Sequence, residues 1–148
     1  MTPATDSRDK EEIRKVVRQI YGAISGPAGP RNWAFMARSF APEGRLIVVH
    51  KQADGSIKLQ PLTVADYERT RSPYFNENAF YENETRSDIV IEDNLAHAIS
   101  YYESRHAPAE PPFDTGVNFI QLVRTSDGWR VLSTMWEAGA VATRLTAS

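Results

Sequence analysis

Apolar side chains recur at intervals of three and four residues near the start of the chain, which predicts a helix with one buried face. Asp6 or Ser7 can cap its start, and residues 25–27 (SGP) end it. A shorter helix is expected after Gly29 and Pro30. The apolar positions of the first helix are Ile13, Val16, Val17, Ile20, Tyr21 and Ile24, and those of the second are Trp33, Met36, Ala37 and Phe40.

The periodicity changes after Gly44. Residues 45–50 (RLIVVH) are rich in β-branched side chains and predict a strand, and Asp54-Gly55 predicts a tight turn to a hairpin partner at residues 56–60. The capping box at residues 63–66 (TVAD) begins a third helix, with Val64, Tyr67 and Arg71 at helical spacing. Because Pro73 disfavours helix at the residue before it, this helix is expected to end at Ser72.

Four long strands are predicted in the second half of the chain, at residues 80–92, 95–106, 113–125 and 129–138. Strands of this length in a small protein must twist and bend, commonly at bulges. The pattern therefore predicts one α+β domain over residues 1–148, in which a curved antiparallel sheet wraps around N-terminal helices and encloses a pocket.

Neither of the last two strands has a clean polar face. In residues 117–123 both sides carry apolar side chains, and in residues 129–138 Val131 and Met135 alternate with Leu132 and Trp136. Both faces of the sheet are therefore expected to be covered. Helices cover one face, and a second copy of the chain in a homodimer covers the outer face. The alternative is a monomer in which long polar side chains cover that face.

Composition narrows the function classes. The 148 residues include no cysteine, so thiolate chemistry and disulfides are excluded, and the net charge of −2 gives no electrostatic case for nucleic acid. No apolar run reaches the ~20 residues of a membrane helix. The polar N-terminus is unlike a signal peptide, so a cytoplasmic location is expected. The sequence carries no phosphate-loop, nucleophile-elbow or metal motif, and no cofactor is expected.

Residues 96–103 (AHAISYYE) and 113–133 (FDTGVNFIQLVRTSDGWRVLS) resemble the nuclear transport factor 2-like superfamily. The likeness is to a SnoaL-like and ketosteroid isomerase-like branch of small members without an assigned reaction. It implies a cone-shaped, cystatin-like fold in the order α-α-β-β-α-β-β-β-β. The superfamily includes isomerases, dehydratases, cyclases and non-enzymatic transport factors, so it identifies a fold and no single reaction.

The ketosteroid isomerase mechanism is not expected. In the resembling enzyme the first helix supplies an oxyanion-hole tyrosine, and Tyr21 falls at the similar place. The general base lies in the strand after the second helix, where this chain has Val48 and Val49. A proton shuttle of that kind needs a carboxylate.

Polar residues of two neighbouring strands are the candidates for pocket chemistry. Tyr102 and Glu103 point to opposite faces, so only one can look into the pocket. A buried Glu103 could act as acid or base; alternatively it pairs outside with Arg105 or Arg124. Asp114 and Asn118 share a face with Gly116 between them, as a polar pair in the pocket or, alternatively, as backbone caps in a bent strand.

The histidines His50, His97 and His106 lack the spacing of a metal motif. They could converge with Asp114 on a metal, but surface or strand-end positions are the simpler expectation, and no metal site is predicted.

The sequence thus predicts a pocket for a small apolar molecule with polar handles. If it is catalytic, a lyase or isomerase without cofactor is expected, with Glu103, Asp114 and Tyr21 as catalytic candidates. The alternative is a non-catalytic dimeric interaction module whose cone is filled by its own side chains. A cavity of at least ~300 Å³ would favour a ligand. The predicted pocket residues are Tyr21, Trp33, Tyr102, Asp114, Asn118 and Trp136.

Overall fold

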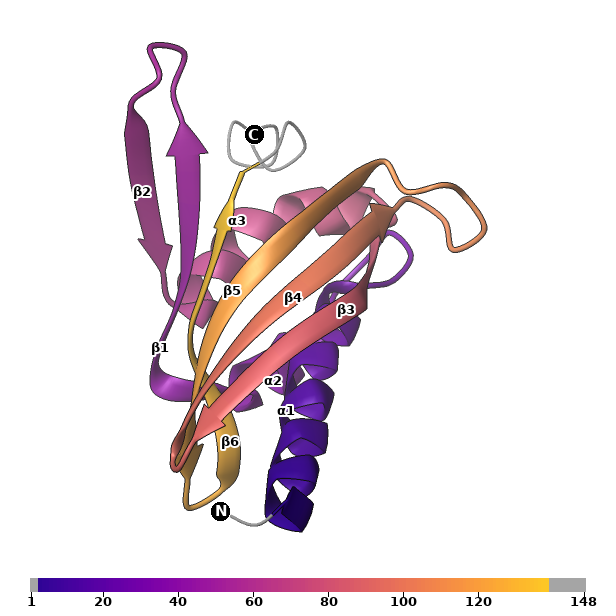
Figure 1. Ribbon diagram of the computed structural model, residues 1–148. Helices are drawn as coiled ribbons and strands as arrows, with labels where there is room; N and C mark the ends of the chain where they lie inside the picture. Colours follow the sequence, from indigo (N-terminus) through magenta and orange to yellow (C-terminus); the bar gives the residue numbers. More distant parts are fainter. Residues whose placement is uncertain (1–2, 139–148) are drawn as a thin grey trace.

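The helices and strands of the computed structural model, which describes residues 3–138, follow the predicted order α-α-β-β-α-β-β-β-β. Three helices precede or interrupt the first strands, and four long strands complete the chain (Figure 1). The elements are α1 (Pro3–Ile24), α2 (Trp33–Arg38), β1 (Phe40–Lys51), β2 (Ile57–Leu62), α3 (Val64–Glu77), β3 (Tyr81–Glu92), β4 (Leu95–Arg105), β5 (Asp114–Thr125) and β6 (Gly128–Glu137).

The strands form one sheet of six, in the order β2-β1-β6-β5-β4-β3. It is mixed and not wholly antiparallel as predicted, because β1 and β6 pair in parallel. Residues 52–127, about half of the chain, lie between these two strands, which leaves room for the crossover that parallel strands require. Register shifts occur in β1, at residues 84–86 of β3 and at residues 121–122 of β5. These irregularities bend the sheet, as expected for such long strands.

Helix α1 lies along the concave side of the sheet and contacts β3 and β6 (Figure 1). Its buried stripe includes Ile13, Val17 and Tyr21, as the periodicity predicts. The helix begins at Pro3, earlier than expected, and Asp6 lies within its first turn, 3.4 Å from Lys10. That i,i+4 pair supports the added turn.

The two short helices are set by their caps. Asn32 accepts a hydrogen bond from the Phe35 amide, so α2 begins after Asn32. Phe40, which was predicted to lie in this helix, is instead the first residue of β1. The capping box of Thr63 and Asp66 is confirmed.

The expectation that α3 ends at Ser72 is wrong, because the helix continues through Pro73 to Glu77. Phe75 is 1% exposed and packs on Phe80, which outweighs the one backbone hydrogen bond that a proline removes.

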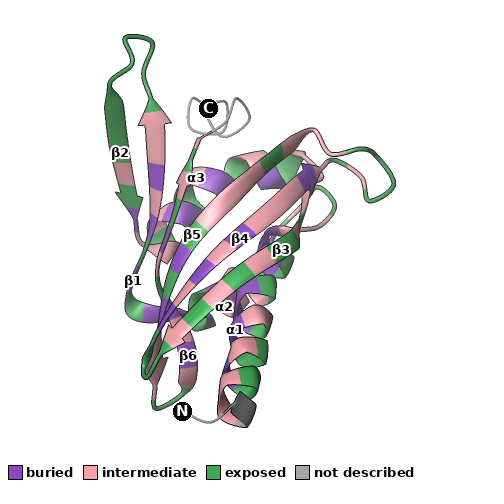
Figure 2. Cartoon of the chain, in the orientation of Figure 1, coloured by how far each residue is buried: buried purple, intermediate pink, exposed green. Residues whose placement is uncertain are grey.

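The two faces of the sheet differ in their cover (Figure 2). In β4, Ala96, Ala98, Ser100 and Ser104 are buried against the helices, and the alternate positions are more exposed. The opposite side, here called the outer face, exposes large apolar side chains within one chain. They are Val90, Leu95, Phe119, Leu132 and Met135. Across residues 3–138, none of the helices combines the length and apolar character needed to cross a membrane.

Candidate functional site

A cavity of about 80 Å³ lies between the concave face of the sheet and the helices α1 and α3. It is smaller than the ~300 Å³ that would favour a ligand, so that expectation from the sequence is not met. At ~10–15 Å³ for each water-sized sphere, the space fits a ligand of roughly five to eight heavy atoms, or a larger one if side chains move. Its apolar wall consists of Val17, Ile20, Ile24, Met36, Leu46, Phe75, Phe80 and Ile120.

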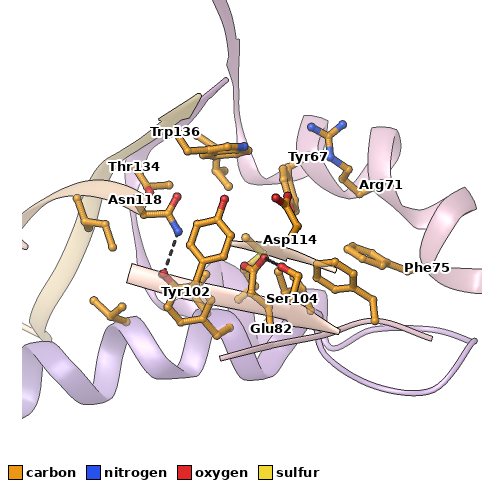
Figure 3. A pocket seen from close by; sticks show the side chains of 18 residues that line it. Tyr67, Arg71, Phe75, Glu82, Tyr102, Ser104, Asp114, Asn118, Thr134 and Trp136 are labelled. Carbon is orange, nitrogen blue, oxygen red and sulfur yellow. Dashed lines mark hydrogen bonds between the residues drawn. The ribbon is translucent and has the colours of Figure 1, made fainter. Parts of the chain in front are cut away.

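Polar residues enter the cavity in rows that cross neighbouring strands. Glu82 of β3 pairs with Ser104 of β4, which pairs with Asp114 of β5. In the next row Tyr102 pairs with Gly116. Residues in one row share a face and have adjacent side chains. The registers of the long strands therefore bring two carboxylates and a tyrosine to one wall (Figure 3).

Glu82 is the principal residue that the sequence did not reveal. Its carboxylate accepts a hydrogen bond of 2.8 Å from the Ser104 hydroxyl. Burial raises the pKa of Glu82 to about 7, the Ser104 hydrogen bond acts against this rise, and the charge of Asp114 adds to it. Near neutral pH this carboxyl group therefore exists in both protonation states, as an acid–base catalyst requires.

A bulge in β3 turns Glu82 inward. Ile89 and Ile91 face the core, and a regular strand would continue this face through Thr85 and Asn83. The register shift between residues 84 and 86 moves the inward face to Glu84 and Glu82. A one-residue shift reverses the facing of every side chain beyond it.

The start of β3 is also held to the end of α1. The hydroxyl group of Ser25 accepts a hydrogen bond from the Glu82 amide at 2.9 Å and donates to the Tyr21 carbonyl at 2.7 Å. Glu82 also borders a hollow at the surface between α1 and β3, together with Gly22 and Asn83. Glu82 therefore lies between the cavity and this surface hollow.

Tyr21 belongs to a chain of hydrogen bonds. Asn118 Nδ2 donates to the Tyr21 hydroxyl at 2.9 Å, which lies 2.8 Å from Ser100 Oγ, and Ser100 donates to Glu84 at 2.5 Å. Because the Ser100 proton goes to Glu84, the Tyr21 proton goes to Ser100. Burial raises the pKa of Tyr21 above its ordinary value, so the hydroxyl stays protonated. The Tyr21 hydroxyl proton is thus used in a hydrogen bond within the protein and is not available to a ligand.

Tyr102 presents a second hydroxyl group to the cavity. Figure 3 shows its ring between Asn118 and Asp114. Burial raises its pKa, and the charges of Glu82 and Asp114 add to the rise, so Tyr102 is a hydrogen-bond donor at neutral pH. A Cβ atom at Gly116 would lie 2.3 Å from the Tyr102 hydroxyl oxygen. Glycine at this position therefore makes room for the hydroxyl group.

Among the described residues, Arg71 of α3 is the one basic residue in the cavity wall. It is 1% exposed, and its guanidinium carbon lies 5.2 Å from the centre of the Tyr67 ring. Burial raises the pKa of Tyr67 to about 12, although the charge of Arg71 acts against the rise. Tyr67 also packs edge-on against Trp136, with ring centres 6.2 Å apart.

Most of the predicted pocket residues come together around the cavity: Tyr21, Tyr102, Asp114, Asn118 and Trp136. Trp33 lies behind the wall, where its ring packs on Tyr67 and Phe75. Glu103 faces the other way, since the strand alternates, and it pairs with Arg105 at 2.5 Å. The candidate role of Glu103 as a buried acid or base is therefore wrong, and its alternative, an outer pair with Arg105, is what the structure has.

The histidines do not converge. His50 contacts Gln60 through Nε2 at 2.9 Å, and His106 stacks on Phe113 with ring centres 4.0 Å apart. His97 lies near Phe119 on the outer face. Among residues 3–138, no three histidine or acidic side chains are grouped so that they could hold a metal ion.

Comparison with known proteins gives a match in structure only. Neither the known family models nor the curated protein sequences match the chain. A protein from Kribbella flavida is 19% identical with a TM-score of 0.69, over 97% of this chain and 99% of its own. An NTF2-like protein with a cystatin-like fold from Novosphingobium aromaticivorans is 16% identical with a TM-score of 0.64, over 96% and 91%.

A third similar structure, from the same Novosphingobium species, is described as a candidate scytalone dehydratase. It is 12% identical with a TM-score of 0.66, over 91% of this chain and 87% of its own. The chain thus has the α+β fold of the NTF2-like, cystatin-like proteins, with a mostly apolar cavity inside its cone. At these identities the likeness extends to the fold alone.

Proposed function

We propose that this protein is a cofactor-independent lyase or isomerase that moves a proton on a small, mostly apolar carbonyl compound. The observation that carries the proposal is the row of Glu82, Ser104 and Asp114 beside the Tyr102 hydroxyl, all in the wall of one apolar cavity. Acid–base chemistry without a cofactor needs such a pair, a carboxylate to carry the proton and a donor for the oxygen that becomes negative.

Glu82 is the proton carrier in this scheme. Its carboxylate removes a proton from the carbon next to the substrate carbonyl, and the electron pair moves onto the carbonyl oxygen. The Tyr102 hydroxyl donates a hydrogen bond to that oxygen. The protonated Glu82 then returns the proton to another carbon, which is an isomerisation, or to a departing hydroxyl group, which is an elimination of water.

The surroundings of Glu82 suit both steps. Ser104 orients the carboxylate through its 2.8 Å hydrogen bond, and a pKa near 7 lets the group accept and release the proton at neutral pH. The candidate scytalone dehydratase with the same fold is in keeping with an elimination reaction.

Hydrogen–deuterium exchange tests the first step without knowledge of the full reaction. The protein in D₂O is mixed with small cyclic ketones such as cyclohexanone and cyclohexenone, and loss of the proton next to the carbonyl is followed by NMR. We expect exchange above the buffer rate in the natural protein and a loss of at least about 100-fold in Glu82→Gln, the usual scale for a general base.

The matched control is Glu103→Gln, which changes a carboxylate on the outer face of the neighbouring strand. Its exchange rate should equal that of the natural protein. Exchange that survives Glu82→Gln, or that never exceeds the buffer rate with any of these ketones, would contradict the proposal.

The interaction module is the second candidate function, and the outer face is the observation that favours it. Phe119 and Met135 are paired neighbours on β5 and β6, and each is more than 40% exposed. Such a patch marks a contact surface, and a second copy of the chain is the proposed occupant, within the cytoplasm.

Native mass spectrometry should show a dimer that Phe119→Lys converts to monomer, whereas Lys58→Ala, on the exposed β2 strand, keeps it. A monomer at all concentrations would refute the dimer.

A further inference from the structure

Arg71 is a buried cation whose hydrogen-bonding capacity is largely unused. Its Nη2 atom has no hydrogen-bond partner within residues 3–138. Nη1 donates one long hydrogen bond of 3.4 Å to Thr70, and a side-chain hydrogen bond between Arg71 and Tyr67 acts against the rise in the pKa of that tyrosine. Arg71 takes part in none of the ion pairs formed by that part of the chain. Figure 3 shows its side chain next to Tyr67 at one end of the cavity.

The other buried arginine of residues 3–138, Arg31, uses its donors fully. Arg31, 9% exposed, donates to carbonyl oxygens of Ile24, Pro27, Gly29, Gly26 and Asn78. A buried charge without a partner is strongly unfavourable, so such groups are normally paired. The contrast indicates that the partner of Arg71 comes from outside residues 3–138, and a bound anion would supply it.

We propose that Arg71 binds the carboxylate group of the substrate, which makes the substrate a small, mostly apolar monocarboxylic acid. That the bound anion is a substrate rests on the proposed function. That Arg71 binds an anion rests on the geometry of Arg71 alone. A guanidinium group presents paired N–H donors that match the two oxygens of a carboxylate.

The charge balance of the cavity favours a monoanion over a phosphate. Within residues 3–138, Arg71 is its one basic side chain, whereas Glu82 and Asp114 are acidic. A doubly charged group would meet two carboxylates with a single counter-charge, while a carboxylate is neutralised by Arg71.

The position of Arg71 also separates the group that would bind the substrate carboxylate from the groups that would react with the substrate. Its stacking on Tyr67 fixes the guanidinium group, and neither Glu82 nor Asp114 forms an ion pair with it. A carboxylate held there leaves the opposite part of the substrate for Glu82 and Tyr102. Such an anchor on a non-reacting group positions the reacting carbon.

Pairs of probes that differ only in charge test the inference. Acetate and benzoate are compared with acetamide and benzamide by isothermal titration calorimetry and ligand-observed NMR at neutral pH. We expect benzoate to bind the natural protein at least tenfold more tightly than benzamide. Arg71→Gln should weaken benzoate at least tenfold and leave benzamide unchanged.

Arg69→Gln is the matched control, because Arg69 lies on the same helix, is 70% exposed and pairs with Asp66. It should bind benzoate as the natural protein does. Equal affinity of benzoate and benzamide for the natural protein would overturn the inference, and this comparison does not require that any variant folds.

Glu82→Gln separates this inference from the proposed reaction. The variant should lose proton exchange and keep its preference for benzoate, because the anion binds to Arg71. If exchange fails in the natural protein even with a keto acid such as 4-oxopentanoate, which carries both groups, while the benzoate preference holds, the anion site stands and the reaction is wrong. If the preference is missing while exchange holds, the anion site is wrong and the reaction stands.

Discussion

The two ends of the cone each bury a carboxylate and contain an arginine, but the two groups are paired at one end and unpaired at the other. At the start of α1, Asp9 receives two hydrogen bonds from Arg124, at 2.9 and 2.7 Å, and one of 3.2 Å from Trp129 Nε1. These hydrogen bonds from Arg124 hold the pKa of Asp9 below its ordinary value. In the cavity, Glu82 and Arg71 form no ion pair with each other, and burial raises the pKa of Glu82 to about 7.

The difference separates structure from function. The group of Asp9, Arg124 and Trp129 satisfies its own charges and fastens α1 to β5 and β6, which stabilises the fold. The cavity holds charges that destabilise the folded chain. Groups of this kind are typical of catalytic and binding sites, where they act on a ligand.

The largest expected effect comes from breaking the paired end. Asp9→Asn removes the charge that Arg124 requires, and the free energy of unfolding should fall by about 3 kcal/mol, near the lower limit for a buried pair because Arg124 is partly exposed. Urea denaturation measures this loss. Asp6→Asn, which changes an exposed pair with Lys10, should lower the free energy of unfolding by less than about 0.5 kcal/mol.

The pH dependence of the same pair has a defined sign. Because the pKa of Asp9 is lowered in the folded state, its contribution to stability is present above the unfolded pKa of about 3.9 and is lost as the pH falls through the folded value. Equal losses in the Asp9 and Asp6 variants would remove the distinction between the two ends.

Glu82 should show the opposite dependence. Its folded pKa of about 7 lies above the unfolded value, so the folded state binds the proton more tightly. The free energy of unfolding should therefore decrease by roughly 2 kcal/mol as the pH rises from about 4.5 to about 7, less than the full shift implies because Glu82 borders a surface hollow. Comparing the pH profiles of Glu82→Gln and the natural protein by urea denaturation isolates this contribution, with Glu103→Gln as the control. A profile unchanged by Glu82→Gln would show that the carboxyl group is ordinary.

Arg71→Met should stabilise the protein while it abolishes anion binding. The substitution replaces a buried cation that lacks a partner by an apolar side chain of similar length, and we expect a gain of roughly 1–2 kcal/mol. Thermal and urea unfolding measure the gain, and Arg69→Met, on the exposed side of α3, should change little. A loss of stability in Arg71→Met would mean that Arg71 is a structural residue after all.

Gly116→Ala should have the smallest effect on stability and a large one on activity. The added methyl group would occupy the place of the Tyr102 hydroxyl, which can turn away at about 1 kcal/mol. Proton exchange should then fall at least tenfold. Gly22→Ala, where a Cβ meets open space, should leave exchange intact. Full activity of Gly116→Ala would exclude Tyr102 as the donor.

Local signals in the sequence predicted most of the fold. The capping box of Thr63 and Asp66 and the turn before Trp129 lie where short-range hydrogen bonds require them. The predicted end of α3 before Pro73 was wrong because packing of Phe75 extends the helix beyond the proline. The parallel pairing of β1 with β6 depends on contacts between distant segments, which no local pattern encodes.

The candidate site was predicted in part for the same reason. Asp114 and Asn118 followed from strand alternation, whereas Arg71 was recognised by its helical spacing with Val64 and Tyr67 but not as a pocket residue. Glu82 was not predicted, because a single bulge at residue 85 reverses the face of the strand before it. The signal was present as two glutamates, Glu82 and Glu84, two residues apart, but their facing depends on the bulge.

One NMR titration tests the contrast between the two ends most directly. In a single ¹³C-labelled sample, the side-chain carboxyl carbons of Asp9 and Glu82 are followed from acid to neutral pH. The account predicts that Glu82 titrates near pH 7 and Asp9 below 3.8. If both groups titrate at the ordinary values of exposed carboxyl groups, the unpaired charge in the cavity, and the function built on it, are contradicted.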